Sequence, residues 1–442
     1  MRALCSAGAG IGHDSAMATT EPIAPRGRPR PRVVVVGAGF GGLNAALGLI
    51  GSGAEVTVVD RDNYHGFWPL LYQVATAGLA PEDIAHPIRS IFAGRPDVTV
   101  RHAAVTGIDL ERRVVAVDRG DPLEYDYLVL APGSATADFD IPGVAEHAFA
   151  LKTLADAVHL RNHVLECFER ADAQPEKVPG LLTVVLVGGG PTGVEMAGAL
   201  AELIGTNLAL DFPHLEVSDA RVVLVEALDH LLGGFSRASQ EEALRVLRTK
   251  GVEVLLEAPL AEVRADGVLL ADGRAVVAST VVWTAGVRAN PLAELLPGDR
   301  ARNGTVPVGA DLSLPGRPEV FVVGDMALVD GGEGRPLPQL AQVAIQGGRH
   351  VARVIRSRLA GAPAPAFRYH NHGIMATIGR RAAVAELPGR IALRGTVGWL
   401  AWLVVHLVFL IGFRNRVVVL VNWAWNYITW DRASRVIMVD RQ

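Results

Sequence analysis

The sequence predicts an α/β fold with two βαβ units, each built on a parallel sheet, followed by a C-terminal helical segment of different character. A strand, a glycine-rich turn, a helix and a second strand follow one another over residues 33–60, and the same order returns over residues 182–226. Strands joined through helices are typical of parallel sheets covered on both faces. The stretch from about residue 395 to 430 is instead strongly apolar and rich in Trp.

Composition narrows the classes of protein that need to be considered. The 442 residues are enough for two or three domains, and the net charge of -4 leaves no overall basic surface for nucleic acid. We therefore expect small molecules or apolar surfaces as partners. Only Cys5 and Cys167 occur, which excludes a disulfide framework and a Cys-rich metal cluster. No metal site is predicted, and a reducing compartment fits.

Residues 1–31 are rich in Ala, Gly, Pro and Arg and lack the apolar core of a signal peptide. We expect a disordered leader. An organellar transit peptide and translation from Met17 are the alternatives.

The first unit starts with four consecutive valines, a β-branched run typical of a strand buried on both faces. The elements of the first unit are expected at residues 33–36, 43–50 and 55–60, and those of the second at 182–187, 194–204 and 221–226.

The first glycine-rich turn has the spacing G-x-G-x-x-G, directly after a strand and before a helix. Gly37 permits the tight turn, Gly39 lets the backbone approach a pyrophosphate, and Gly42 lets the helix pack on the strand. The free N–H groups of the helix N-terminus suit phosphates. Asp60, at the end of the second strand, can accept hydrogen bonds from a ribose. Together these features predict a Rossmann-like dinucleotide-binding domain.

The second turn repeats this design with Gly188, Gly190 and Gly193, and Glu226 ends its second strand. A carboxylate at that position binds two ribose hydroxyls and repels a 2′-phosphate, which favours NADH over NADPH. Glu195 follows in the first turn of the helix, where two interpretations stay open. It either stabilises the helix N-terminus, or contacts the nicotinamide or handles protons near the reacting ring.

Each unit is closed by a buried strand that ends in small residues, where the chain can cross close to a ligand. The first crossing runs over residues 127–133 and contains Ala131 and Gly133, and the second runs over residues 280–286 and ends at Gly286.

These motifs resemble those of the type II, non-proton-pumping NADH:quinone dehydrogenases, members of the two-dinucleotide-binding flavoprotein superfamily that includes glutathione reductase. The resemblance covers about residues 32–439. It rests on the two glycine turns, both crossings and the tail, together with the stretches at residues 65–78, 323–325 and 341–346.

The resemblance implies a glutathione-reductase-like fold in which the first unit binds FAD and the second binds NADH. It assigns Gly324 and Asp325 to the FAD ribitol and pyrophosphate. It assigns Gln342 and Gln346, four apart on one helix face, to the quinone site. The expected domains are then a leader at 1–31, an FAD-binding domain in two segments at 32–145 and 291–365, an NADH-binding domain at 146–290 between them, and a membrane-anchoring and dimerisation segment at 366–442.

Two relatives of the superfamily are excluded by residue inventory. Disulfide reductases and sulfide:quinone oxidoreductases need paired cysteines, and the corresponding stretch, residues 64–77, has none. The EF-hand loop of some eukaryotic members is absent as well.

The apolar run at residues 397–413 is short for a bilayer span and is followed by Arg414 and Arg416. Five of the seven Trp lie between Trp399 and Trp430, a pattern typical of the membrane interface. We expect monotopic attachment by amphipathic helices; a transmembrane span and a buried core or dimer helix are the alternatives. His406 is interpreted as a structural histidine. A homodimer is expected from the resemblance.

The function expected is respiratory NADH:quinone oxidoreduction without proton pumping. Hydride passes from NADH to FAD and two electrons pass to a membrane quinone, with menaquinone favoured. The expected location is the cytoplasmic face of a bacterial inner (plasma) membrane. A soluble ferredoxin or rubredoxin reductase, and a redox sensor or assembly factor resembling apoptosis-inducing factor, are the rival functions.

Overall fold

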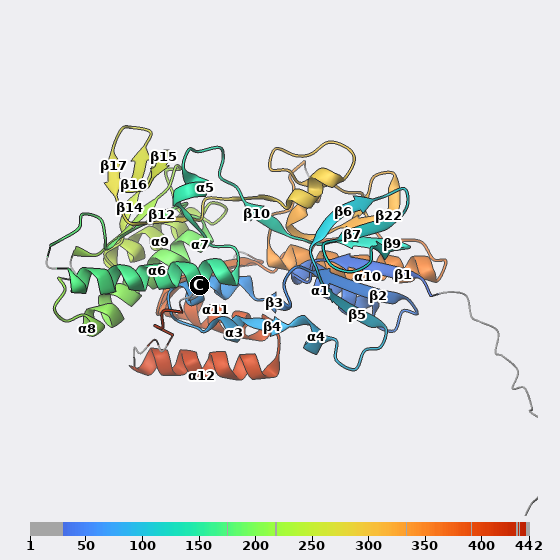
Figure 1. Cartoon of the computed structure of the whole chain (residues 1–442), viewed down its shortest axis with the longest axis horizontal. Helices are drawn as coiled ribbons and strands as arrows, with labels where there is room; N and C mark the ends of the chain where they lie inside the picture. The colour runs from blue at the N-terminus through green and yellow to red at the C-terminus, as the bar shows by residue number, and fades with distance from the viewer. Residues whose placement is uncertain are drawn as a thin grey trace, which may run out of the picture.

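The computed structural model describes residues 30–174, 176–216, 219–332, 334–389, 391–429, 432 and 434–438. The expected leader, apart from its last two residues, and Trp430 lie outside these ranges. Two sheet-based units lie side by side, and the last helix, α12 (Phe413–Thr429), runs along one edge of the molecule (Figure 1).

The first unit is a six-stranded sheet in the order β21-β22-β9-β1-β2-β5. Its strands β1, β2, β5, β9 and β22 are parallel to their neighbours, and β21 pairs antiparallel with β22 at the edge. Helix α1 packs against the long helix α10. The bounds are β1 Arg32–Val36, α1 Phe40–Leu49, β2 Glu55–Asp60, β5 Val98–His102, β9 Tyr127–Leu130, β21 Ser313–Leu314, β22 Arg317–Val322 and α10 Ala341–Leu359.

The second unit has a five-stranded parallel sheet in the order β11-β18-β12-β13-β14. Both α1 and α7 begin three residues earlier than the sequence predicted, because each starts inside its glycine turn. Helix α7 also continues into a π-helical turn over Leu203–Leu208. The bounds are β11 Phe149–Ala150, α6 Leu154–Ala173, β12 Thr183–Val187, α7 Pro191–Glu202, β13 Arg221–Val225, α9 Arg237–Thr249, β14 Glu253–Leu255 and β18 Thr280–Trp283.

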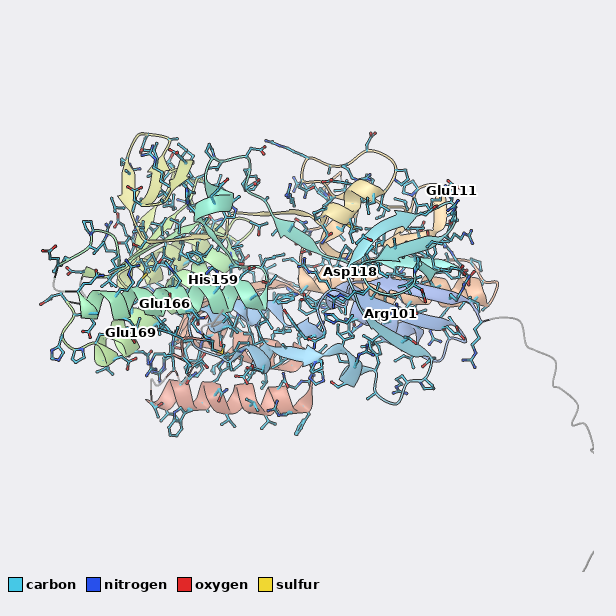
Figure 2. The ribbon with its side chains drawn as sticks, viewed as in Figure 1. Arg101, Glu111, Asp118, His159, Glu166 and Glu169 are labelled. Atoms are coloured by element: carbon cyan, nitrogen blue, oxygen red, sulfur yellow. The ribbon has the colours of Figure 1, made fainter. Side chains whose placement is uncertain are left out.

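Helix α6 shows how an amphipathic segment covers the second unit. Leu160, Val164 and Phe168 are buried, whereas His159 and Glu166 are exposed on the outer face with Glu169 (Figure 2). The two chain crossings between the units pair antiparallel as β10 (Ser134–Thr136) and β19 (Val287–Ala289). They place the ends of both units close together. The domain boundaries stay a prediction.

The C-terminal region contains a sheet that the sequence did not predict. Strands β24 (Ile374–Gly379), β25 (Ala382–Leu387) and β26 (Ile391–Arg394) form it, β24 packs on α7 and β25 on helix α11 (Gly395–Phe409). Helix α12 (Phe413–Thr429) follows. Trp402 and Trp423 are buried in one apolar cluster with the second unit. None of the helices in the described ranges is long and apolar enough to cross a bilayer.

Candidate functional site

A cavity of about 710 Å³ opens over the glycine turn of the first unit. Gly37 has φ +90°, which a side chain would strain, and a Cβ on Gly42 would overlap the Gly37 carbonyl oxygen. A Cβ on Gly39 would instead meet no atom within 4 Å, so this backbone is free to approach a ligand. The turn therefore forms a cradle at the N-terminus of α1, as an FAD pyrophosphate requires.

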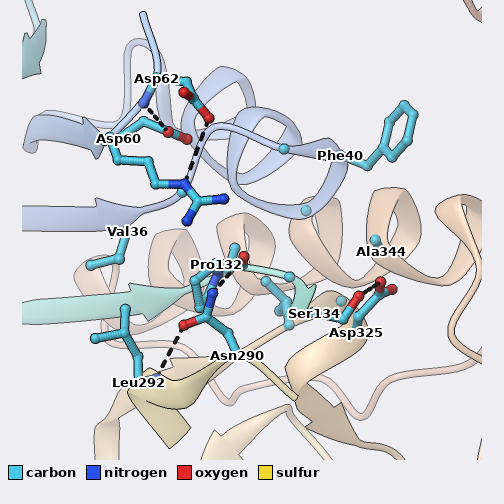
Figure 3. A pocket seen from close by; sticks show the side chains of 18 of the residues that line it. Val36, Phe40, Asp60, Asp62, Pro132, Ser134, Asn290, Leu292, Asp325 and Ala344 are labelled. Atoms are coloured by element: carbon cyan, nitrogen blue, oxygen red, sulfur yellow. Dashed lines mark hydrogen bonds and ion pairs between the residues drawn. The ribbon is translucent and has the colours of Figure 1, made fainter. Parts of the chain in front are cut away.

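Asp60 lies at one end of the cavity and holds the glycine turn in place. Its carboxylate accepts hydrogen bonds from the Ala38 N–H at 2.5 Å and the Asp62 N–H at 2.8 Å. Burial raises the pKa of Asp60, and the two N–H donors oppose that shift. Figure 3 shows Asp60 and Asp62 together on this side of the cavity.

The opposite wall comes from the crossings and from the turn after β22. Ala131, Gly133, Gly324 and Asp325 all line the cavity, as the resemblance implied. Asp325 Oδ2 accepts a hydrogen bond of 2.6 Å from the Ser134 hydroxyl, which Figure 3 draws. The sequence did not single out Ser134. These residues, more than 100 positions apart in the chain, meet because β9 and β22 are neighbours in one sheet.

The second glycine turn repeats the geometry of the first. Gly188 has φ +107°, a Cβ on Gly193 would overlap the Gly188 carbonyl oxygen, and a Cβ on Gly190 would meet no atom within 4 Å. Glu226 holds the second turn in the same way as Asp60 holds the first. Its carboxylate accepts hydrogen bonds from the Gly189 N–H at 2.6 Å and the Leu228 N–H at 2.9 Å. Both predicted turns thus have the same dinucleotide-binding build.

The two turns meet through the start of α7. Thr192 belongs to the second turn and lines the large cavity, whose floor is formed by the first turn. Gly286 lies on the second crossing, where a Cβ would press on the Phe139 ring. The second unit therefore contributes to the wall of the cavity that lies over the first turn.

Glu195 lies one turn further along α7 and faces away from solvent. Its Oε1 accepts a hydrogen bond of 3.2 Å from the Thr377 N–H of β24. Burial raises the pKa of Glu195 to about 8, with the Thr377 and Trp402 contacts opposing the shift. The carboxyl is therefore predominantly neutral at pH 7 and can give up a proton near that pH. It lines a small cavity with Tyr72 and Trp402.

Gln342 and Gln346 do not present free amides, which differs from the expectation. Gln342 donates to the Gly373 carbonyl and accepts from the His372 N–H. Gln346 donates to the His370 carbonyl and accepts from the His370 N–H. Two residues four apart on a helix are about 6 Å apart along its axis, close to the repeat of about 6.6 Å for alternate residues of an extended chain. The pair thus clamps residues 370–373 onto α10.

His406 fits the structural interpretation. Its ring stacks on Trp402 with centroids 3.9 Å apart, and its Nδ1 lies 2.7 Å from the Trp402 carbonyl oxygen. Burial lowers its pKa to about 4, so the ring is neutral at physiological pH.

Helix α12 is fixed to residues 73–85 of the first unit by its polar side. The Asn415 amide donates to three carbonyl oxygens, those of Glu82, Asp83 and Ala85, at 3.1–3.2 Å. Trp423 Nε1 donates to Gln73 Oε1 at 2.8 Å. The side facing away from the protein carries exposed apolar residues, namely Phe413, Val417, Leu420, Val421, Trp425 and Ile428.

The paired glycine turns and the shared cavity define a two-dinucleotide-binding flavoprotein. In agreement, residues 31–348 match the profile of the pyridine nucleotide-disulphide oxidoreductases, and residues 371–429 match the NDH2 C-terminal domain.

Curated relatives narrow the family further. The chain is 39% identical over 438 residues to "Type II NADH:quinone oxidoreductase Ndh" of Mycobacterium tuberculosis, covering 96% of this chain and 93% of that protein. It is 31% identical to the type II NADH:quinone oxidoreductase of Staphylococcus saprophyticus, covering 82% of this chain and 90% of that protein. The structure of NDH2 from Plasmodium falciparum in complex with NADH superposes with a TM-score of 0.83 at 19% identity, over 93% of this chain and 100% of that one.

The chain belongs to the type II NADH:quinone oxidoreductase family. The family, the α/β fold and the FAD-dependent oxidoreductase class predicted from the motifs are confirmed. A sulfide:quinone oxidoreductase from Aquifex aeolicus shares the fold, with a TM-score of 0.70 at 19% identity over 87% of this chain and 91% of that one. The only cysteine among the described residues, Cys167, is buried in α6.

Proposed function

We propose that this chain oxidises NADH on its second unit and passes the electrons through FAD to a lipid-soluble quinone. The observation that carries the proposal is Thr192, which belongs to the second glycine turn and lines the cavity of the first. When bound, FAD supplies the chemistry that accepts hydride and returns electrons. With both dinucleotides bound, the second turn would bring NADH to the cavity that holds FAD, and hydride would pass directly from one cofactor to the other.

We propose the following roles for the residues of the site. Gly37, Gly39 and Asp60 hold the FAD pyrophosphate and adenosine ribose, with Ala131, Gly133, Gly324 and Asp325 on the facing wall. The second turn and Glu226 hold NADH, and Gly286 lets the crossing run close to it. Glu195 handles a proton, because its burial keeps the carboxyl neutral near pH 7. We assign Gln342 and Gln346 the positioning of residues 370–373 beside the quinone site.

The two C-terminal helices suit attachment to one leaflet of a membrane. Helix α12 turns its asparagines toward the protein and its apolar residues outward, the reverse of a helix on a water-facing surface. Helix α11 adds exposed apolar side chains, namely Val397, Leu400, Val404, Val408 and Phe409. Such an exposed apolar surface fits a monotopic anchor through which a quinone enters from the lipid.

The finer points of the proposal rest on the family. We place the enzyme on the cytoplasmic face of a bacterial inner membrane, as a homodimer that uses menaquinone and pumps no protons. The two bacterial relatives named above support the bacterial setting.

Steady-state NADH oxidation in the presence of a short-chain quinone tests the acceptor. The purified, FAD-loaded protein is expected to reduce the quinone faster than it reduces ferricyanide at equal concentration. Quinone reduction no faster than that of ferricyanide, or faster reduction of a ferredoxin, would contradict the quinone assignment.

A further inference from the structure

Lys152 lies where the two units meet and was not singled out by the sequence. It follows β11 of the second unit, yet its side chain reaches the first unit. Its Nζ donates to the Ser134 hydroxyl at 2.7 Å and lies 3.9 Å from Asp325 Oδ2. Ser134 in turn donates to the same Asp325 oxygen at 2.6 Å. All three residues line the large cavity.

The backbone that carries Lys152 is held rigidly at the start of α6. The N–H groups of Lys152 and Thr153 both donate to Asp156 Oδ2, at 3.0 and 2.8 Å. The Thr153 hydroxyl accepts from the Asp156 N–H at 3.1 Å, which completes a capping box. The side chain is only 35% exposed, and burial lowers the pKa of its ammonium while Asp325 opposes the shift.

The position of Lys152 along the cavity follows from its neighbours. The second unit is the part of the chain that lies between β10 and β19 in the sequence. Among the described lining residues, it contributes only Lys152, Thr153 and Thr192. On the placement of FAD and NADH proposed above, the nicotinamide would enter the cavity at this end, so the flavin ring would lie here and the adenosine would lie at the Asp60 end. The other cationic residue in the lining is Arg61, which pairs with Asp62 beside Asp60. Among the described lining residues, Lys152 is therefore the cation at the flavin end.

We propose that Lys152, held beside Asp325 where the resemblance places the FAD ribitol, puts a positive charge near the flavin ring and thereby raises the reduction potential of the bound FAD. Ser134 and Asp325 fix the ammonium in place. A cation favours the uptake of electrons by the group it faces, and charge near the ring is a means by which proteins tune flavins. The proposal rests on the placement of FAD and NADH given above and is independent of the electron acceptor.

Potentiometric titration of FAD-loaded variants tests the proposal without any quinone. Lys152→Met is expected to lower the midpoint potential and reduce the equilibrium constant for reduction by NADH about tenfold. Lys152→Arg is expected to stay within about twofold of the wild type because the charge remains. Lys177→Met, at an exposed lysine, is the matched control. A wild-type potential in the FAD-loaded fraction of Lys152→Met, even where the FAD content falls, would show that the residue only pins the units together.

Lysine acylation followed by mass spectrometry gives a second readout. The sequence has three lysines, Lys152, Lys177 and Lys250, so each is measured separately. A succinimidyl ester is expected to modify Lys152 several times more slowly in the FAD-loaded protein than after removal of FAD, and Lys177 equally in both. Equal modification of Lys152 in both states would overturn its contact with the cofactor, while leaving the quinone assignment untouched.

Discussion

Replacing Glu195 by Gln removes a carboxyl that lies between α7 and β24. The carboxyl has a pKa of about 8 in the folded protein, against an ordinary value of 4.5. It is therefore neutral in the folded protein below pH 8 but ionises in the unfolded chain above pH 4.5. Its contribution to stability is fully present below pH 4.5 and is lost as the pH rises through 8.

The structure gives the size of this effect. At about 1.36 kcal/mol per pKa unit, the loss between pH 4.5 and pH 8 is about 5 kcal/mol. Gln has nearly the same shape and keeps an oxygen for the Thr377 N–H, but it does not ionise. We expect Glu195→Gln to match the wild type in stability near pH 5 and to exceed it above pH 8.

Thermal unfolding of the FAD-loaded proteins at pH 5 and pH 8.5 measures the difference. Glu294→Gln, at an exposed carboxylate, controls for the loss of one negative charge. If the two melting temperatures differ by the same amount at both pH values, Glu195 is not held neutral by burial and its proposed proton-handling role loses its basis.

Three further predictions address separate regions of the protein. Glu226→Ala is expected to raise the KM for NADH about tenfold and to weaken discrimination against NADPH, measured by steady-state kinetics; unchanged selectivity would remove its ribose role. Gly42→Ala is expected to abolish FAD binding because its Cβ overlaps the Gly37 carbonyl oxygen. Flavin absorbance per protein measures this, with Gly205→Ala, where a Cβ meets no atom, as control; full FAD content in Gly42→Ala would contradict the overlap. Combined Phe413→Ser and Ile428→Ser substitutions are expected to move the protein from the membrane pellet to the supernatant with FAD retained. Leu210→Ser is the exposed apolar control, and an unchanged pellet fraction would place the anchor elsewhere.

The sequence predicted those elements of the site that lie within one short stretch of chain. A strand, a glycine turn and a helix are consecutive, and the conformation of the turn depends on Gly37 and Gly42 themselves. The acid at the end of the next strand follows from the parallel pairing of β1 with β2. In the second unit, β12 and β13 pair in parallel in the same way, so the sequence could assign Glu226 to the second turn. Helix starts were misplaced by three residues because glycine is a poor guide to the first helical turn.

The sequence could not show how distant segments fit together. The spacing of Gln342 and Gln346 indicated a shared face but not that residues 370–373 would occupy it. The short strands β24 to β26 carry little periodicity, and the packing of β24 against α7 covers Glu195.

By itself, the sequence determined two dinucleotide-binding turns, the acids that accompany them, the absence of paired cysteines and an apolar tail. Only the tertiary structure decided that Thr192 and Lys152 of the second unit reach the cavity of the first, and that the tail turns its asparagines inward and its apolar residues outward. The physical reason is that a glycine turn is specified by local backbone sterics. The environment of a charge or an amide is specified by groups that folding brings from distant positions in the chain.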